Sequence, residues 1–407
     1  RHVHYQRGVL RVCDDLYDLK SYSRVVCISF GKAAHRMAEI LSRQVGSTVE
    51  GIVADPNRHP YQLPGYRYFA GGHPLPNEES VRAAEAILKT LGALNPQSLV
   101  ISLISGGGSA AVEKPVDSEI TLPDLVSTYK ALVNSGAPIA QINAVRKHLS
   151  AVKGGRMARA ANGAQQVSIM ISDVPENALD SLSSGPTMPD STTVEDCYRI
   201  AHEHNMLPEF PASVRELFER RALDETPKQD DPAFVRSRWW NVLSNETAEK
   251  AAAAAAARHG FAVEIDHGCD DWNYERAAHY LLDRLRLLQS SVGRACIISG
   301  GEVTVKVPAG AGSGGRNQHF ALYCAQQIAG ENIAVLSAGT DGIDGVSPAA
   351  GAVADGTTVE RAQKAGLDVA AHFDGFNSFP LFEKLGDSIQ TGPTGNNVRD
   401  LRVLLAW

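Results

Sequence analysis

The first half of the chain alternates short apolar runs with longer stretches in which apolar residues recur at helical spacing. The runs are rich in β-branched residues, and most of them end in a turn of small residues. Strand, turn and helix in alternation indicate βαβ units around a parallel sheet. The pattern therefore predicts a doubly wound α/β sandwich, with strands at Arg24–Phe30, Gly51–Ala54, Ser98–Ile104 and Gln166–Ile171.

The pattern lapses over residues 222–238, which are polar, contain proline and show no periodicity. Such a segment is typical of the approach to a domain boundary. A strong alanine-rich helix is predicted next, over Asn245–Ala257. Further strands are predicted at Cys296–Ser299, Glu302–Val307, Ile333–Ala338 and Leu401–Ala406. We therefore expect two α/β domains, at residues 1–235 and 236–407, because 407 residues exceed one ordinary core.

Composition and net charge limit the possible binding partners more than they limit the possible folds. The net charge of −7 favours neither a nucleic-acid backbone nor an anionic membrane as a partner. The sequence contains no run of about 18 apolar residues, the length that would indicate a membrane helix. The six cysteines are scattered without metal spacing, which favours a reducing, cytoplasmic setting, with Cys27, Cys296 and Cys324 as core residues. Because the chain starts at Arg1, removal of a leader stays open.

Two turns in the first half are candidates for binding an anion. Lys32 follows Gly31 at a strand-to-helix turn, where a bound phosphate or carboxylate would relieve the conflict between its charge and the helix dipole. The segment from Ser105 through Gly106, Gly107 and Gly108 to Ser109 follows a fully apolar strand, so its backbone could approach a ligand closely. A solvated lysine and a flexible turn are the structural alternatives.

A cationic run and a strand-end carboxylate extend this set. Arg146, Lys147, His148, Lys153 and Arg156 fall within eleven residues of an acidic protein, and phosphoryl transfer needs such charges. A solvated helix face is the alternative for that run.

Asp173 ends the fourth predicted strand, where a carboxylate could accept a hydroxyl proton or bind Mg²⁺. An ordinary helix cap is the alternative for this residue.

The second half carries a similar set. Gly314, Gly315 and Arg316 open a predicted helix, which suits capture of an anion. Asp341 and Asp344 lie on a glycine-rich loop after a strand, where carboxylates could share Mg²⁺ with nucleotide phosphates. Glycine turns at predicted strand ends in both halves suggest that the domains face one shared cleft.

Together these stretches resemble the type II glycerate kinases, a two-domain family whose C-terminal half is called MOFRL and whose members were often labelled hydroxypyruvate reductases. The resemblance covers most of the chain in the right order, and GTDGIDG and GGRNQ are its most specific motifs. It is carried by SFGKAA, GGHPLPNEES, LISGGGSA, INAVRKHLSAVKGGRMA, ISDVPENALDSLSSGPTMPD, SGGEVTVKV, GSGGRNQHFAL, SAGTDGIDGVSPAAGAVADGTT and TGPTGNNVRDLRVLL.

The resemblance implies phosphorylation of D-glycerate to 2-phosphoglycerate with ATP and Mg²⁺. It also implies a Rossmann-like three-layer N-terminal domain, a MOFRL-type α/β domain and an active site in the cleft between them. Lys32 and Arg316 match family motif positions and are expected to be catalytic, with Asp173 as the candidate for accepting the hydroxyl proton. Asp341 and Glu302 are the expected metal ligands. The expected nucleotide-binding residues are Ser105, Gly106, Gly107, Gly108, Ser109, Gly314, Gly315, Asn317 and Asn397.

The chain departs from the family pattern at a few positions in these motifs, namely Glu176, Asn177, Ser313, His319 and Asn396. Two rival functions stay open. A nicotinamide-dependent hydroxypyruvate reductase would need a GxGxxG turn after a strand, and none of the glycine turns fits that pattern. A non-catalytic protein that binds nucleotide or a hydroxy acid is the second rival. The oligomeric state is open, with a homodimer as one option.

Overall fold

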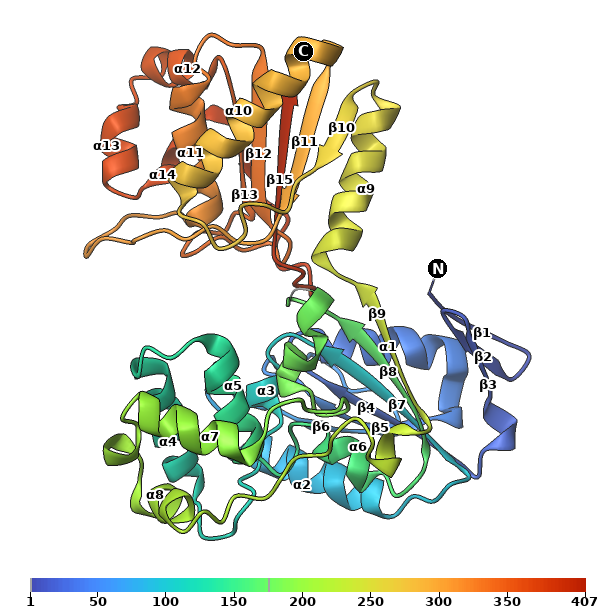
Figure 1. The fold of residues 1–407 in the computed structure, drawn as a ribbon. Coiled ribbons are helices and arrows are strands. Elements are labelled where there is room, and N and C mark those ends of the chain that lie inside the picture. The colour runs from blue at the N-terminus through green and yellow to red at the C-terminus, as the bar shows by residue number, and fades with distance from the viewer. Residues whose placement is uncertain (1, 175) are drawn as a thin grey trace. The chain divides into compact units, whose positions relative to one another are not determined.

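The computed structural model describes residues 2–174 and 176–407, and divides into two compact units, Arg1–Val242 and Leu243–Trp407. Each unit contains a six-stranded sheet, so the α/β fold class expected from the sequence is confirmed (Figure 1). The division falls after Val242 and not after residue 235. The reason is that β9 (Ser237–Leu243) joins the sheet of the first unit as its edge strand.

The sheet of the first unit has the order β6-β5-β4-β7-β8-β9, and the strands from β6 to β8 are parallel. All four strands predicted in this half are present, because their apolar runs are buried on both faces. The strand bounds are β4 Arg24–Phe30, β5 Glu50–Ala54, β6 Tyr66–Phe69, β7 Ser98–Ser105 and β8 Gln165–Ile171.

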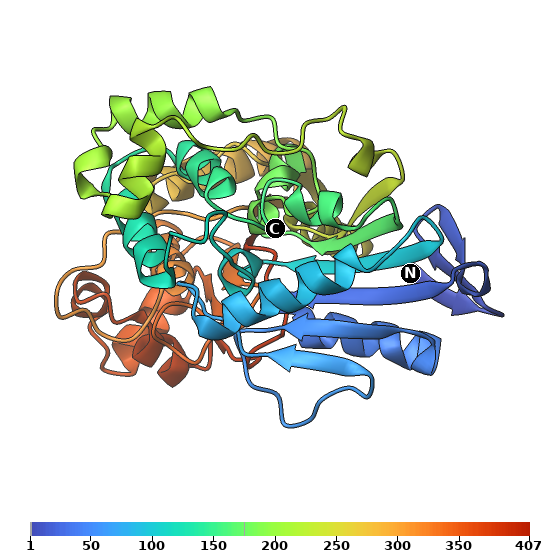
Figure 2. The same ribbon diagram turned by 90° about the horizontal axis from the view of Figure 1, so that it is seen from below.

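Helices cover both faces of this sheet. Figure 2 shows α1 (Ala34–Val45) behind the strands and α2 (Glu78–Gly92) in front of them. The core between α2 and the sheet includes Ile28, Ile87 and Val100, all 1% exposed or less. The remaining helices nearest the sheet are α3 Gly108–Ala111 and α6 Arg156–Ala160.

Four helices of the first unit, grouped together in Figure 1, have a core of their own. Leu125, Val145 and Val214 in this core are fully buried. They are α4 Leu122–Asn134, α5 Ile139–His148, α7 Val194–Glu203 and α8 Ala212–Glu219. A small antiparallel sheet precedes the large one and consists of β1 Val3–Gln6, β2 Val9–Val12 and β3 Asp15–Asp18. Short 3-10 turns lie at Leu19–Ser21, Gly46–Thr48, Glu176–Ser184, Leu207–Glu209 and Pro232–Phe234.

The second unit has a mixed sheet in the order β10-β11-β15-β12-β13-β14. Its strands are β10 Ala262–Ile265, β11 Ala295–Gly300, β12 Ile333–Gly339, β13 Gly351–Asp355, β14 Ser388–Ile389 and β15 Asp400–Ala406. Strand β15 runs antiparallel to both β11 and β12, so the ends of β11 and β12 meet the start of β15 at one edge.

Helices α10 and α11 pack on the face that carries Ile297, Val335 and Leu404, and α9 lies against β10 and β11. The predicted alanine-rich helix is confirmed as α9, whose N-terminus is capped by the hydroxyl of Ser244. The helix bounds are α9 Asn245–Arg258, α10 Tyr274–Val292, α11 Arg316–Gln327, α12 Thr358–Lys364, α13 Val369–Asp374 and α14 Ser378–Leu385.

The strand predicted at Glu302–Val307 is wrong. Of its three alternating valines only Val303 is buried in the core, while Val307 is 60% exposed. The segment instead bonds to the loop before α10, through the N–H and carbonyl groups of Thr304 with Trp272 and Tyr274. Alternation was present, but within the described part of the chain the segment forms only an isolated bridge, between Thr304 and Asn273, and joins no sheet.

Candidate functional site

The carboxyl edge of the first sheet brings the predicted anion-binding turns together. Because Phe30 pairs with Ile104, the turns after β4 and β7 lie side by side. The N–H of Lys32 donates to the carbonyl of Gly106 at 2.9 Å, and the N–H of Ala33 donates to Oγ of Ser105 at 3.0 Å. Gly31 has φ of +110°, and a Cβ there would overlap the Ser105 oxygens, so this approach requires glycine.

Asp173 lies at the same turn. It follows β8, which pairs with β7, and its carboxylate occupies the space that a Cβ on Gly106 would need. The side chains of Lys32 and His73 lie next to Gly107. The structure therefore brings together three of the predicted elements of the site: Lys32, the glycine turn and Asp173.

Two serines that the sequence analysis did not single out also contact the turns at this sheet edge. Ser183 donates from its hydroxyl to the carbonyl of Ser105 at 3.0 Å, and the hydroxyls of Ser184 and Ser109 are 3.0 Å apart. Both Ser183 and Ser184 have left-handed backbones, with φ of 51° and 62°. The SSGPT turn, which contains two serines, was the available signal, but their contact partners lie more than 70 residues away.

The cationic run is mostly structural, which corrects the interpretation that it supplies charge for phosphoryl transfer. Lys147 is 3% exposed, and its ammonium lies 3.1 Å from carboxylate oxygens of both Asp180 and Asp190. Lys153 is equally buried and is paired with Glu113. Arg156 donates to the carbonyl oxygen of Asp224 at 2.9 Å. Lys147 and Lys153, whose charges are neutralised within the fold, are not available to a ligand.

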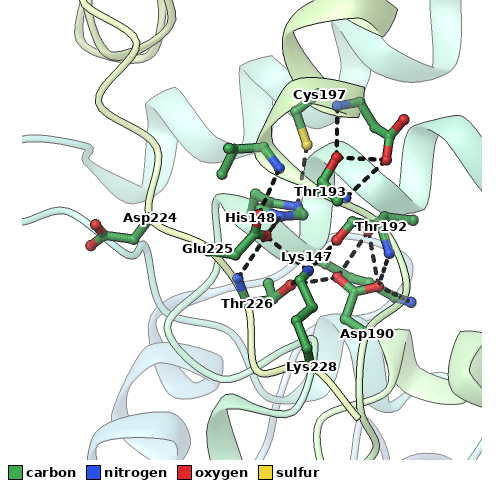
Figure 3. Close-up of polar contacts among 12 residues, drawn as sticks. Lys147, His148, Asp190, Thr192, Thr193, Cys197, Asp224, Glu225, Thr226 and Lys228 are labelled. Atoms are coloured by element: carbon green, nitrogen blue, oxygen red, sulfur yellow. Dashed lines mark hydrogen bonds and ion pairs between the residues drawn. The ribbon is translucent and has the colours of Figure 1, made fainter. Parts of the chain in front are cut away.

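Figure 3 shows the polar network that holds the end of α5. His148 is fully buried, and its Nε2 lies 3.0 Å from a carboxylate oxygen of Glu225. Asp190 accepts hydrogen bonds from Lys147 and from the hydroxyl of Thr226, at 3.1 and 2.9 Å. Burial alone would raise the pKa of Asp190, but Lys147 and the Thr192 donors outweigh it and lower that pKa. The network is thus a satisfied, charged joint between α5 and the segments around 190 and 225.

In the second unit Arg316 is held by two carboxylates. Its Nε and Nη2 donate to Asp400 at 2.6 and 3.1 Å, and Nη2 lies 2.9 Å from Glu302. Burial would lower the pKa of Arg316, but the bonds to Asp400 and the charge of Glu302 raise it, so the guanidinium stays charged. The sequence prediction placed Glu302 as a metal ligand, and the structure places it beside Arg316. Asp400 was missed, because its role depends on β15 lying beside β12.

The N-terminus of α11 is occupied by a side chain of the protein. The Asp344 carboxylate accepts the N–H groups of Asn317 and Gln318 at 3.0 and 2.8 Å, and it fills the space beside Gly315. Burial raises the pKa of Asp344 against the effect of these donors. An internal carboxylate therefore satisfies two of the free N–H groups at this helix start, and capture of a ligand anion there stays a prediction.

The two predicted amide contacts also have internal partners. Asn317 is 1% exposed, donates to Asp344 at 3.4 Å and accepts the hydroxyl of Ser337 at 2.6 Å. Asn397 accepts the N–H of Arg399 through its side chain at 2.9 Å. These contacts fix the loops, and the Asn317 side chain in particular is not free to meet a nucleotide.

A cavity of about 560 Å³ opens beside these loops, within the range of about 300–1,000 Å³ that is usual for ligand pockets. Its wall combines Arg316 and Asp341 with the glycines of both loops and with exposed apolar side chains such as Val307 and Ile343. A polar, charged end and an apolar side are what a nucleotide needs for its phosphates and its base.

Asp341 is the carboxylate of this cavity that could contact a metal. Its Oδ1 accepts the N–H of Ile343 at 3.1 Å, which leaves other carboxylate lone pairs. Across residues 2–174 and 176–407, no three His, Cys, Asp or Glu side chains are grouped to hold a metal. Mg²⁺ commonly takes only one or two protein carboxylates together with substrate phosphates, so Asp341 fits that mode.

The residues that depart from the family pattern lie in different environments. His319 is 4% exposed and stacked between Phe373 and Phe376, and burial lowers its pKa to about 4, so it is a neutral core residue. Ser313 donates its N–H to Asn377 at 2.9 Å and lies on the rim loop. Asn396 donates its N–H to the hydroxyl of Thr394. The side chains of Glu176 and Asn177 lie outside the described residues.

Fold and site together define a class: a two-unit α/β protein with glycine turns at the edge of each sheet. Two family models match the chain, a domain of unknown function (DUF4147) over residues 1–219 and the MOFRL family over residues 295–400. A D-glycerate 2-kinase of Thermotoga maritima is 34% identical, covering 93% of this chain and 89% of that protein. A protein of Agrobacterium vitis with the provisional name hydroxypyruvate reductase is 37% identical over 94% of this chain and 87% of its own length.

Solved structures agree. The crystal structure of a glycerate kinase from Thermotoga maritima matches with a TM-score of 0.86 and 34% identity, over 94% of this chain and 92% of that one. A Pyrococcus horikoshii protein matches with a TM-score of 0.85 and 32% identity, over 100% and 93%. The chain belongs to the MOFRL glycerate kinase family. Both kinase names and reductase names are thus attached to relatives that match this chain over most of its length.

Proposed function

We propose that the protein transfers the terminal phosphoryl group of ATP to D-glycerate and forms 2-phosphoglycerate. The observation that carries the proposal is the cluster at the first sheet edge, where Lys32, the glycine turn and Asp173 meet. The likeness to a D-glycerate 2-kinase along 93% of the chain supports the same reaction.

The roles follow from charge and position. Lys32 neutralises negative charge on the transferring group, because phosphoryl transfer depends on positioning and electrostatics more than on covalent help. The turn from Ser105 to Ser109 holds one anion against its backbone. Asp173, beside Gly106, accepts the proton of the attacking hydroxyl.

The 560 Å³ cavity of the second unit is proposed to hold ATP, with Arg316 toward its phosphates. Asp341 would hold Mg²⁺ there together with the phosphate oxygens. The metal, when bound, supplies neutralisation of the phosphate charge. That these groups and Lys32 act in one cleft between the units stays a prediction.

Two further properties belong to the proposal. The six cysteines are unpaired in the structure, as they are in proteins of a reducing compartment, and we place the enzyme in the cytoplasm. No helix within the described residues is long and apolar enough to cross a membrane. A homodimer stays a prediction, which light scattering would measure.

The test is glycerate-dependent formation of ADP, with the product identified by NMR, in the wild type and in Lys32→Ala. The variant should lose at least about 100-fold in kcat, the scale of a lost transition-state charge contact. Lys130→Ala, an exposed lysine on α4 of the same unit, is the matched control and should behave as wild type. Full activity of Lys32→Ala would refute the role of Lys32. Oxidation of NADH with hydroxypyruvate, without ADP formation from ATP and glycerate, would refute the reaction.

A further inference from the structure

A second, smaller cavity lies in the first unit beside the glycine turn. Its volume is about 110 Å³, and its wall includes Gly107, Ser109, Tyr129 and Arg146, with His73 at the exposed rim. An apolar cavity of about 150 Å³ holds a molecule the size of benzene. The cavity therefore matches a ligand of three or four carbon atoms and is far too small for a nucleotide.

Arg146 and Arg156 are the two members of the cationic run without an ion pair within the described residues, and Arg146 is the one in the wall of this cavity. Within the described residues its guanidinium forms no ion pair, and its Nε is buried without a hydrogen-bond acceptor. The adjacent residues Lys147 and His148 both have carboxylates at about 3 Å. Burial lowers the pKa of Arg146, and the nearby charge of Glu113 opposes this effect only in part. Removing a cation from water in this way costs free energy unless an anion pairs with it.

The surroundings of Arg146 hold it toward the cavity. Its guanidinium lies over the ring of Tyr129, 4.9 Å from the ring centre. The hydroxyl of Tyr129 donates to Glu113 at 2.5 Å, and Glu113 also accepts Ser150 at 2.5 Å and pairs with Lys153. Glu113, whose charge acts on Arg146, is thus already bound by three other groups. The network of Figure 3 fixes the next two residues of α5, so the backbone of Arg146 is held in place as well.

We propose that this cavity is the subsite for the hydroxy acid, and that Arg146 binds its carboxylate. The inference rests on the proposed function and adds to it the residue that selects an acid. A guanidinium offers a carboxylate two parallel hydrogen bonds, which fixes the orientation of a small substrate. Gly107, in the wall of the cavity, is next to Lys32, so a bound acid has its hydroxyl end within reach of the phosphoryl-transfer groups. The size of the cavity limits the substrate to short acids.

The experiment compares Arg146→Gln and Arg146→Lys with Arg156→Gln. Arg156 is the matched control, since it is an arginine of similar burial whose guanidinium donates to a backbone carbonyl. Binding of D-glycerate is measured by calorimetry without nucleotide, and KM values for glycerate and ATP are measured separately. Arg146→Gln should raise both the Kd and the KM for glycerate about 10- to 100-fold, the effect of losing hydrogen bonds to a charged group. Arg146→Lys should recover part of the loss.

The KM for ATP should stay at the wild-type value in both Arg146 variants. With glycerol, which lacks the carboxylate, turnover should be equal in wild type and Arg146→Gln. Unchanged glycerate binding in Arg146→Gln overturns the subsite. A rise confined to the KM for ATP also overturns it and assigns Arg146 to a nucleotide phosphate. Wild type that binds glycerate by calorimetry but forms no ADP refutes the kinase reaction and leaves the subsite intact, so the two failures are distinguishable.

Discussion

Replacing Lys147 with methionine tests whether the buried charges of α5 are structural. Methionine keeps most of the volume of the side chain but removes the ammonium that lies 3.1 Å from Asp190. The Asp190 side chain is fully buried, so the variant leaves an uncompensated carboxylate in the protein. Breaking a buried pair in this way costs about 3–5 kcal/mol. For a unit of this size, each kcal/mol lowers Tm by about 2–4 °C, so Tm should fall by roughly 6–20 °C.

Differential scanning calorimetry on the full chain measures this loss, and activity is assayed well below the transition. Lys130→Met, on the exposed face of α4, is the matched control and should change stability by less than about 0.5 kcal/mol. The double variant Lys147→Met with Asp190→Asn should be more stable than the sum of the two single losses predicts, because no buried charge is left unpaired. If Lys147→Met had an unaltered Tm and a large loss of kcat, the structural role of Lys147 would be refuted, and Lys147 would belong to the functional site.

Two other predictions follow from the same reasoning about charge. Burial would raise the pKa of Glu225, but Lys228 and His148 outweigh this effect and lower the pKa from 4.5 to about 2. The ionised carboxylate therefore stabilises the fold above pH 4.5, and this contribution is lost as the pH falls toward 2. Glu225→Gln should reduce the slope of Tm against pH between pH 4.5 and 2. The loss of stability near neutral pH should be only about 1 kcal/mol, because the side chain is 42% exposed. An unchanged slope would contradict the pairing. Arg316→Lys should lower the stability of the second unit by about 1–3 kcal/mol, since lysine cannot replace the two-point contact with Asp400. The same variant should raise the KM for ATP at saturating glycerate, and a loss of stability alone would confine Arg316 to holding Asp400.

Local signals in the sequence were sufficient for the parallel sheet and the glycine turns. A buried strand and its turn are encoded in fewer than ten consecutive residues, and the parallel register then fixes which turns are neighbours, as for Gly31 and Ser105. The contact of Asp173 with this edge follows from the same rule, because β8 is the next strand in the sheet.

Partners distant in the sequence could not be predicted. The cationic run looked available for a ligand because its acids, such as Asp190 and Glu225, are 43 and 77 residues away from their bases. Asp344 looked like a metal ligand until the fold placed it at the start of α11, 27 residues away from Asn317. The decisive property of Arg146 is that it forms no ion pair within the described residues, and only the fold, which places its guanidinium over Tyr129, shows it.

The position of β15 has a consequence for how the protein is made. This strand is the last in chain order, yet it lies in the middle of its sheet, bonded on one side to β11 and on the other to β12. During synthesis the first unit can close as soon as residue 242 has left the ribosome. The second cannot complete its sheet, because β11 and β12 both pair with β15 and are joined only when residues 400–406 emerge and are inserted between them. A nascent chain arrested before that point would therefore expose the unpaired edges of β11 and β12 to chaperones, and Asp400 would reach Arg316 only once β15 is inserted.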